Sequence, residues 1–228
     1  SELIAHVKAM GHKYVALTDH SNMHAAVEFY TKAKDAQITP IIGAEIYHSS
    51  PDPDDNKVYQ MLLLARNTQG YHNLMKVLSD GYLSPNLKDV PVVSFEAIQK
   101  YSQGLLAICV CLKGQVSCLV DELLTKANGD MSLSYKDPKF STLRKKLEDH
   151  CEKMLEVFGA NNFYIEIVDN GLSAQKRLIP ALAFYSEQLK VPLVATANAH
   201  YLKKDFEETH ALAVAIKNSL TLRSISNR

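Results

Sequence analysis

The sequence has no excess of charge of either sign and little cysteine, glycine or proline. Its 25 Lys and Arg residues balance 25 Asp and Glu residues, whereas a protein that wraps around nucleic acid normally shows a basic excess. The four cysteines contain no C-x-x-C pair, which argues against a disulfide framework. No targeting peptide is visible, and apolar runs such as 105–111 are too short to span a bilayer. We therefore expect an ordinary globular protein of the cytoplasm with no membrane partner.

Apolar runs and helical stripes alternate along the 228 residues. Leu3, Ile4 and Val7 share one helical stripe, which Gly11 is well placed to end. Further helices are predicted at 25–36, 71–82, 115–126, 143–158, 174–189 and 206–217. Strands are predicted at 14–17, 39–46, 61–64, 105–111, 163–167 and 193–196. Because apolar strands joined through helices are typical of parallel sheets with both faces covered, we predict an α/β barrel rather than separate domains.

Two segments depart from this alternation. The polar stretch 128–140 is predicted to be an irregular surface insertion. The chain opens on a helix, and Ser1 is not a start methionine. Since an alternating α/β protein that opens on a helix has often lost its first strand, we expect the first strand to be missing from this chain.

Polar side chains gather where four of the predicted strands end, which is where parallel α/β folds concentrate their chemistry. Asp19 and His20 follow the first strand, Glu45 ends the second, and Cys111 ends the run from 105. Asn198 and His200 follow the last strand. Imidazole, carboxylate and thiolate groups converging from separate strands are what a transition-metal site requires.

Each of these residues also has an ordinary structural explanation. Asp19 could cap the helix that follows it, and Glu45 could be an exposed strand end. Cys111 could be a buried core thiol, and His200 could be a loop histidine with its hydrogen bonds satisfied. Their shared location favours the site. The remaining histidines are expected to be solvated or structural: 6, 12, 24, 48, 72, 150 and 210.

An ordered series of segments resembles a known family. The segments are 16–23, 26–30, 38–45, 63–67, 70–74, 104–106, 111–114, 163–166, 175–177 and 192–201. They are similar to the PHP (polymerase and histidinol phosphatase) domain, and more closely to the N-terminal PHP domains of bacterial DNA polymerase III alpha subunits. The resemblance covers nearly the whole chain. It implies one N-terminally truncated PHP domain over 1–228.

The resemblance implies a distorted (β/α)7 relative of the TIM barrel with a multinuclear metal site. Intact members hydrolyse phosphoesters with metal-activated water. His20, Glu45, Cys111 and His200 stand at ligand positions of the family, and Asp19 is a possible supporting residue. The family's opening His-x-His strand is absent from this chain.

Two further family ligands are replaced by carboxamides. Gln60 stands where the family has a histidine, and Asn198 where it has an aspartate. Neutral amides compensate the charge of a dication poorly. Even the loss of residues that only hydrogen-bond to the metal ligands costs about 10- to 100-fold in metal affinity or activity. We therefore expect a degraded hydrolytic centre with one zinc or manganese ion, or none.

The resemblance implies a PHP module of a bacterial replicative DNA polymerase, which synthesises DNA with Mg²⁺ bound outside this chain. Its expected partners are the rest of that polymerase, the proofreading exonuclease subunit and, through the parent protein, DNA. A free-standing PHP phosphoesterase such as a histidinol phosphatase is the alternative. A metal-binding structural domain with no role in DNA is a third hypothesis.

Overall fold

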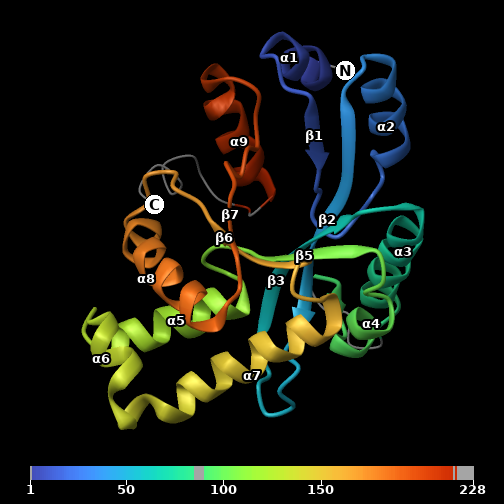
Figure 1. Cartoon of the computed structure of the whole chain (residues 1–228). Helices are drawn as coiled ribbons and strands as arrows, with labels where there is room; N and C mark the ends of the chain where they lie inside the picture. Colours follow the sequence, from blue (N-terminus) through green and yellow to red (C-terminus); the bar gives the residue numbers. More distant parts are fainter. Residues whose placement is uncertain (1, 85–89, 218, 220–228) are drawn as a thin grey trace.

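The computed structural model describes residues 2–84, 90–217 and 219 (Figure 1). Its helices are α1 (Glu2–Ala9), α2 (Ala26–Asp35), α3 (Thr68–Leu83), α4 (Phe95–Lys100), α5 (Gln115–Lys126), α6 (Met131–Lys136), α7 (Ser141–Phe158), α8 (Ser173–Leu189) and α9 (Glu207–Lys217). Its strands are β1 (Tyr14–Leu17), β2 (Thr39–Ser49), β3 (Val58–Ala65), β4 (Val92–Val93), β5 (Leu105–Cys109), β6 (Phe163–Ile167) and β7 (Leu193–Ala195). The predicted helices and strands are all present. The bounds of β1, α5 and β6 match the prediction, and β4, α4 and α6 were not predicted.

One strand runs against the predicted parallel direction. β3 pairs antiparallel with both β2 and β5, whereas β1–β2, β2–β4, β5–β6 and β6–β7 are parallel. The prediction of a parallel sheet is therefore wrong for β3. The reason lies in the segment 50–57, which joins β2 to β3 without a helix. A parallel crossover needs a dozen or more residues, so this short link returns the chain as a hairpin.

The sheet curls but its ends are not paired in the part of the chain that the structure describes (Figure 1). The strand order is β1-β2-β3-β5-β6-β7, with β4 beside β2. We call the face that carries Glu45, Leu62, Ile108 and Tyr164 in one cross-strand row the inner face. Ala16 on this face is exposed, and Leu62 and Tyr164 are half-buried. The expectation that both faces are covered is thus wrong, because an open sheet brings no opposite strands across to fill its inner face.

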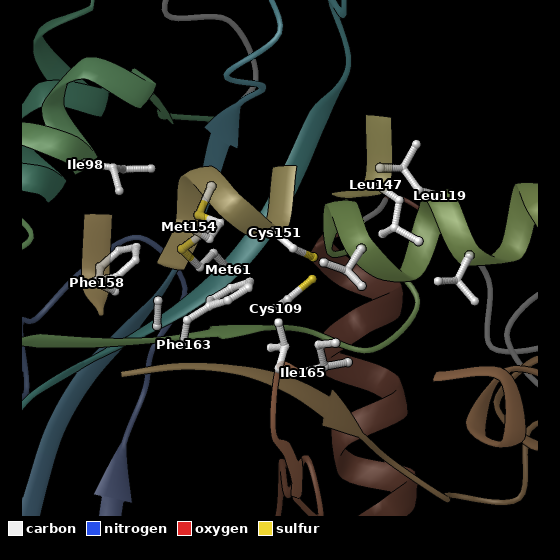
Figure 2. Packing of buried hydrophobic residues seen from close by; sticks show 14 of the residues in the cluster. Met61, Ile98, Cys109, Leu119, Leu147, Cys151, Met154, Phe158, Phe163 and Ile165 are labelled. Atoms are coloured by element: carbon white, nitrogen blue, oxygen red, sulfur yellow. The ribbon is translucent and has the colours of Figure 1, made fainter. Parts of the chain in front are cut away.

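The opposite face carries the main core. Side chains alternate along β6, so Phe163 and Ile165 are fully buried while Tyr164 faces the inner side. Figure 2 shows Phe163 close to Met61 of β3 and Met154 of α7. Helices α3, α4, α5, α7 and α8 all contribute to this cluster. The strands are thereby packed on this side, while on the inner face Leu62 and Tyr164 are partly exposed and Ile108 and Glu166 are buried.

The segment 128–140 is folded rather than irregular. Asp130 caps α6 by accepting from the Leu133 N–H at 2.9 Å, and a 3-10 turn over Pro138–Phe140 follows. Ser134 and Phe140 are buried, and the Ser134 hydroxyl lies 2.9 Å from the Tyr185 hydroxyl. The prediction of an irregular segment is therefore wrong, although most residues of 128–140 are exposed at the surface. Among the described residues, no helix is long and apolar enough to cross a membrane.

Candidate functional site

His20 and Glu45 form the centre of the candidate site. The β1–β2 ladder continues past Leu17, because the Glu45 N–H donates to the Asp19 carbonyl and the Ser21 N–H donates to the Glu45 carbonyl. This pairing places His20 beside Glu45, with 3.4 Å between His20 Nδ1 and Glu45 Oε1. Glu45 does not end its strand as predicted, since β2 continues to Ser49. Its carboxylate is therefore held within the sheet.

The environment of Glu45 disfavours its charged form. Burial raises the pKa of the Glu45 carboxyl, and the nearby Glu166 carboxylate raises it further. His20, Lys113 and His200 act in the opposite direction. Burial is the largest of these influences. A second carboxylate is thus close enough to matter electrostatically, and sequence reasoning did not select it.

Glu166 lies on the inner face of β6 with only 8% of its surface exposed. Its Oε2 accepts from the Cys111 backbone N–H at 2.8 Å, and its Oε1 accepts from the Thr196 hydroxyl at 2.6 Å. Its position within the apolar strand Phe163–Ile167 could have identified it from the sequence. An acidic residue in an otherwise apolar strand needs donors once it is buried.

Cys111 lies in the turn after β5, not at the end of the strand, because β5 stops at Cys109. The thiol is half-buried at the border of the core, and burial is the main influence that raises its pKa. Leu112 follows with φ +70°, a left-handed conformation that is unfavourable for a bulky residue. The turn is therefore shaped by its contacts rather than by its own backbone preference.

His200 extends the site from the other end of the sheet. Its ring lies 6.5 Å from the His20 ring between centroids, and its Nδ1 is 2.8 Å from the Asn198 carbonyl. His210 on α9 lies 5.2 Å from His200 and 5.6 Å from Tyr201, again between ring centroids. Sequence reasoning had left His210 among the solvated or structural histidines. The order of residues gave no sign that α9 would return to this place.

The three remaining candidates play backbone roles in this structure. Gln60 pairs with Tyr47 across β2 and β3, so it shares the inner face with Glu45, and its N–H donates to the Lys113 carbonyl at 3.0 Å. Asn198 is exposed at φ +47°. Asp19 does not cap the next helix, because α2 begins after Ala25 without a side-chain cap.

The chemistry of these donors suits zinc or manganese, but their arrangement does not. The structure brings together His20, Glu45 and His200, whereas the Cys111 thiol lies at the border of the core. Within the described residues, however, no three His, Cys, Asp or Glu side chains are grouped so that they could hold one ion. The residues present do not fit the metal cluster that the resemblance implies.

The comparison with known families decides the identity of the domain. The sequence profile of the PHP domain matches residues 1–170, which is most of the chain. The chain belongs to the PHP domain family. This assignment agrees with the resemblance drawn from the motifs around His20 and Glu45.

Curated relatives extend this PHP assignment. The DNA polymerase III subunit alpha of Deinococcus radiodurans is 32% identical over a 218-residue alignment that covers 91% of this chain and 15% of the relative. The corresponding subunit of Borreliella burgdorferi is 32% identical over a 226-residue alignment that covers 95% of this chain and 18% of the relative. The chain thus spans less than a fifth of the length of these two proteins.

Solved structures are more distant from this PHP domain. A putative metal-dependent phosphoesterase from Bifidobacterium adolescentis shows a TM-score of 0.40 and 10% identity, covering 89% of this chain and 82% of its own. An amidohydrolase from Chromobacterium violaceum shows a TM-score of 0.43 and 11% identity, covering 87% and 80%. These similarities are too weak to inform function.

Proposed function

We propose that this PHP domain is a module of a bacterial replicative DNA polymerase, acting in the cytoplasm. The observation that carries the proposal is the similarity to DNA polymerase III alpha subunits over more than nine-tenths of the chain. The module supports the polymerase core and docks the proofreading exonuclease subunit. DNA synthesis belongs to the parent protein, with Mg²⁺ bound outside this chain.

The module's own phosphoesterase centre is degraded in this proposal. Gln60 and Asn198 bring neutral amides where the family resemblance expects a histidine and an aspartate. His20, Glu45, Cys111 and His200 retain ligand-type groups, so one zinc or manganese ion is the most that we propose. The absence of a grouped donor set among the described side chains supports this interpretation.

The open sheet is compatible with a (β/α)7 barrel that needs one more strand. β1 and β7 end the strand order, and the inner face between them is partly solvent-exposed. We propose that a strand from the same longer protein, placed between β1 and β7, closes the barrel. A longer chain that supplies such a strand should protect the Ala16 and Ala195 amides from hydrogen exchange, since these N–H groups point away from β2 and β6. Unchanged exchange at both amides would argue against closure.

Binding of the exonuclease subunit tests the proposed function directly. The 228-residue chain is immobilised, and the proofreading exonuclease subunit of Deinococcus radiodurans is passed over it. We expect saturable binding that an unrelated α/β protein of equal size does not show. If the exonuclease does not bind and the reading frame stops soon after Arg228, the free-standing phosphoesterase becomes the better hypothesis.

The isolated chain is expected to bind duplex DNA weakly. Its net charge is zero, and phosphate contacts supply most sequence-independent affinity. Fluorescence anisotropy with a labelled duplex, titrated at increasing salt, measures this. Submicromolar binding that survives at about 0.2 M salt would reveal a specific basic groove.

Restoring the two replaced ligands should raise metal binding. The double substitution Gln60→His and Asn198→Asp adds an imidazole on the inner face of β3 and a carboxylate in the loop that carries His200. We expect higher zinc occupancy after dialysis than in the unmodified chain, measured by elemental analysis. The matched control is Gln69→His, an exposed glutamine on α3. Equal occupancy in all three proteins would mean that Gln60 and Asn198 do not occupy the family's ligand positions.

A further inference from the structure

Two loops of the candidate site meet at one buried carboxylate. The Cys111 turn follows β5, the segment 196–200 follows β7, and Glu166 lies between them on β6. In the sheet, β6 pairs with β5 on one side and β7 on the other. A side chain on β6 is therefore the one that can reach both neighbouring loops without crossing a strand.

Both oxygens of this carboxylate are occupied by donors from the chain itself. Oε2 accepts from the Cys111 N–H at 2.8 Å, and Oε1 accepts from the Thr196 hydroxyl at 2.6 Å. Each bond is charge-assisted, and the residue is only 8% exposed, so water competes little for these positions. The carboxylate thus fastens one loop through its backbone and the other through a side chain.

The two loops that it fastens are conformationally demanding. Leu112, next to Cys111, has φ +70°, and Asn198, two residues after Thr196, has φ +47°. A bulky residue such as leucine holds this conformation only when its surroundings require it, whereas asparagine adopts it more readily. The Thr196 N–H also donates to the Ile167 carbonyl at 3.2 Å, so β7 stays paired up to the residue that Glu166 binds. Beyond it, the chain turns to present His200.

We infer that Glu166 is the positioning residue of the site, which links the Cys111 turn to the loop that presents His200 through hydrogen bonds rather than through a metal ion. The inference deepens the proposed PHP module, because it concerns the same inner-face site. It assigns the organising role to a residue outside the ligand set. It also explains how the loops keep their places although the described ligand-type side chains do not form a metal-binding group.

Amide hydrogen exchange and histidine ring resonances of the 228-residue chain, recorded by NMR in EDTA, test this role. Glu166→Ala should accelerate exchange of the Cys111 amide about tenfold or more, since its charge-assisted acceptor is lost. It should also shift the ring resonances of His200. Glu166→Gln keeps the shape and one carbonyl oxygen, so it should restore part of the Cys111 protection.

Thr196→Val distinguishes the effects of the two hydrogen bonds that the Glu166 carboxylate accepts. It removes only the hydroxyl donor, so His200 resonances should shift while the Cys111 amide stays protected. Glu187→Gln, an exposed carboxylate change on α8, is the matched control and should alter neither signal. If Glu166→Ala does not fold, Glu166→Gln and Thr196→Val still provide the contrast.

Three results would overturn the inference. One is unchanged Cys111 exchange together with unmoved His200 resonances in the Glu166 and Thr196 variants. Another is uniform acceleration that also includes the Ala107 and Ile165 amides, which would make Glu166 a general core residue. The third is Cys111 protection that appears only after Zn²⁺ is added. No exonuclease or polymerase enters these measurements, so their failure is distinguishable from failure of the proposed function.

Discussion

The chain is expected to lose about 4 kcal/mol of its unfolding free energy when the pH falls from about 7.5 to 5. Two fully buried histidines cause this loss. Burial lowers the pKa of His48 to about 4 and that of His150 to about 3, where the neighbouring His48 and Lys153 act in the same direction. In the unfolded chain both rings titrate near a pKa of about 6.5.

The direction follows from which state binds the protons. Between about pH 6.5 and 4 the unfolded chain binds two protons that the folded chain does not bind. The unfolding free energy therefore falls with decreasing pH by about 2.7 kcal/mol per pH unit. Above about pH 6.5 both states are neutral at these rings, and the contribution is fully present. Glu45 has the opposite influence, since its raised pKa favours the folded state at low pH. Glu45 is a single group, whereas two histidines, His48 and His150, lower the stability as the pH falls.

The surroundings of His48 and His150 explain why the protonated form of each ring is unfavourable in the folded chain. His48 Nδ1 lies 2.9 Å from the Ser49 carbonyl, and its ring lies 6.1 Å from that of Tyr59. His150 Nδ1 is buried with no hydrogen-bond partner among the described residues. An imidazolium at either place would lack a neutralising carboxylate among the groups that shift its pKa.

Urea unfolding at pH 7.5, 6 and 5 measures the loss. His150→Leu should reduce the slope by about half, since one of the two protons no longer differs between the states. The exposed His24→Gln is the matched control and should leave the slope unchanged. A wild-type stability that is constant over this range, or a slope insensitive to His150→Leu, would show that these rings are protonated in the folded chain.

Gly70→Ala is expected to destabilise the chain by about 3 kcal/mol, although the change improves helix propensity. A Cβ at Gly70 would lie 1.9 Å from the Gly104 carbonyl oxygen and 2.6 Å from its carbonyl carbon. These are backbone atoms, and the same oxygen accepts from the Arg66 N–H at 2.9 Å. An added methyl group at Gly70 would therefore force the first turn of α3 to move away from Gly104.

A second glycine of the same helix provides the control. At Gly81 an added Cβ would lie 3.2 Å from Val93 Cγ2 and 3.3 Å from Pro91 Cβ, contacts that small side-chain movements can relieve. Gly81→Ala should therefore change the unfolding free energy by no more than about 1 kcal/mol. Urea titrations of both variants at pH 7.5 give the comparison. Gly70→Ala as stable as Gly81→Ala would contradict the close approach of α3 to Gly104.

Local patterns were sufficient to predict most helices and strands of this PHP domain. The run Phe163–Ile167 is apolar enough to predict a strand, and the stripe in Gln115–Lys126 predicts a helix. The direction of β3 was not predicted, because apolar composition does not distinguish parallel from antiparallel pairing. The predicted strands 39–46 and 61–64 leave enough residues between them for a crossover, and only the observed extension of β2 to Ser49 and of β3 back to Val58 makes the link too short for one.

The candidate site shows the same division. Strand ends brought His20, Glu45, Cys111 and His200 to attention, and the structure places His20 next to Glu45 and near His200. Glu166 was not selected, because its importance rests on two donors that lie 55 and 30 residues away in the sequence. Contacts of that kind depend on the packing of the whole sheet.

Metal content and nuclease activity, measured together, test most directly whether this PHP domain is a non-hydrolytic module. The purified chain is dialysed against buffered zinc and subjected to elemental analysis, and its 3′-exonuclease activity is assayed on a labelled single strand in Mn²⁺ or Zn²⁺. We expect at most one ion per chain and no cleavage above that of a His20→Ala control. Two or more ions per chain, with cleavage that His20→Ala or His200→Ala abolishes, would contradict the account and establish a working phosphoesterase.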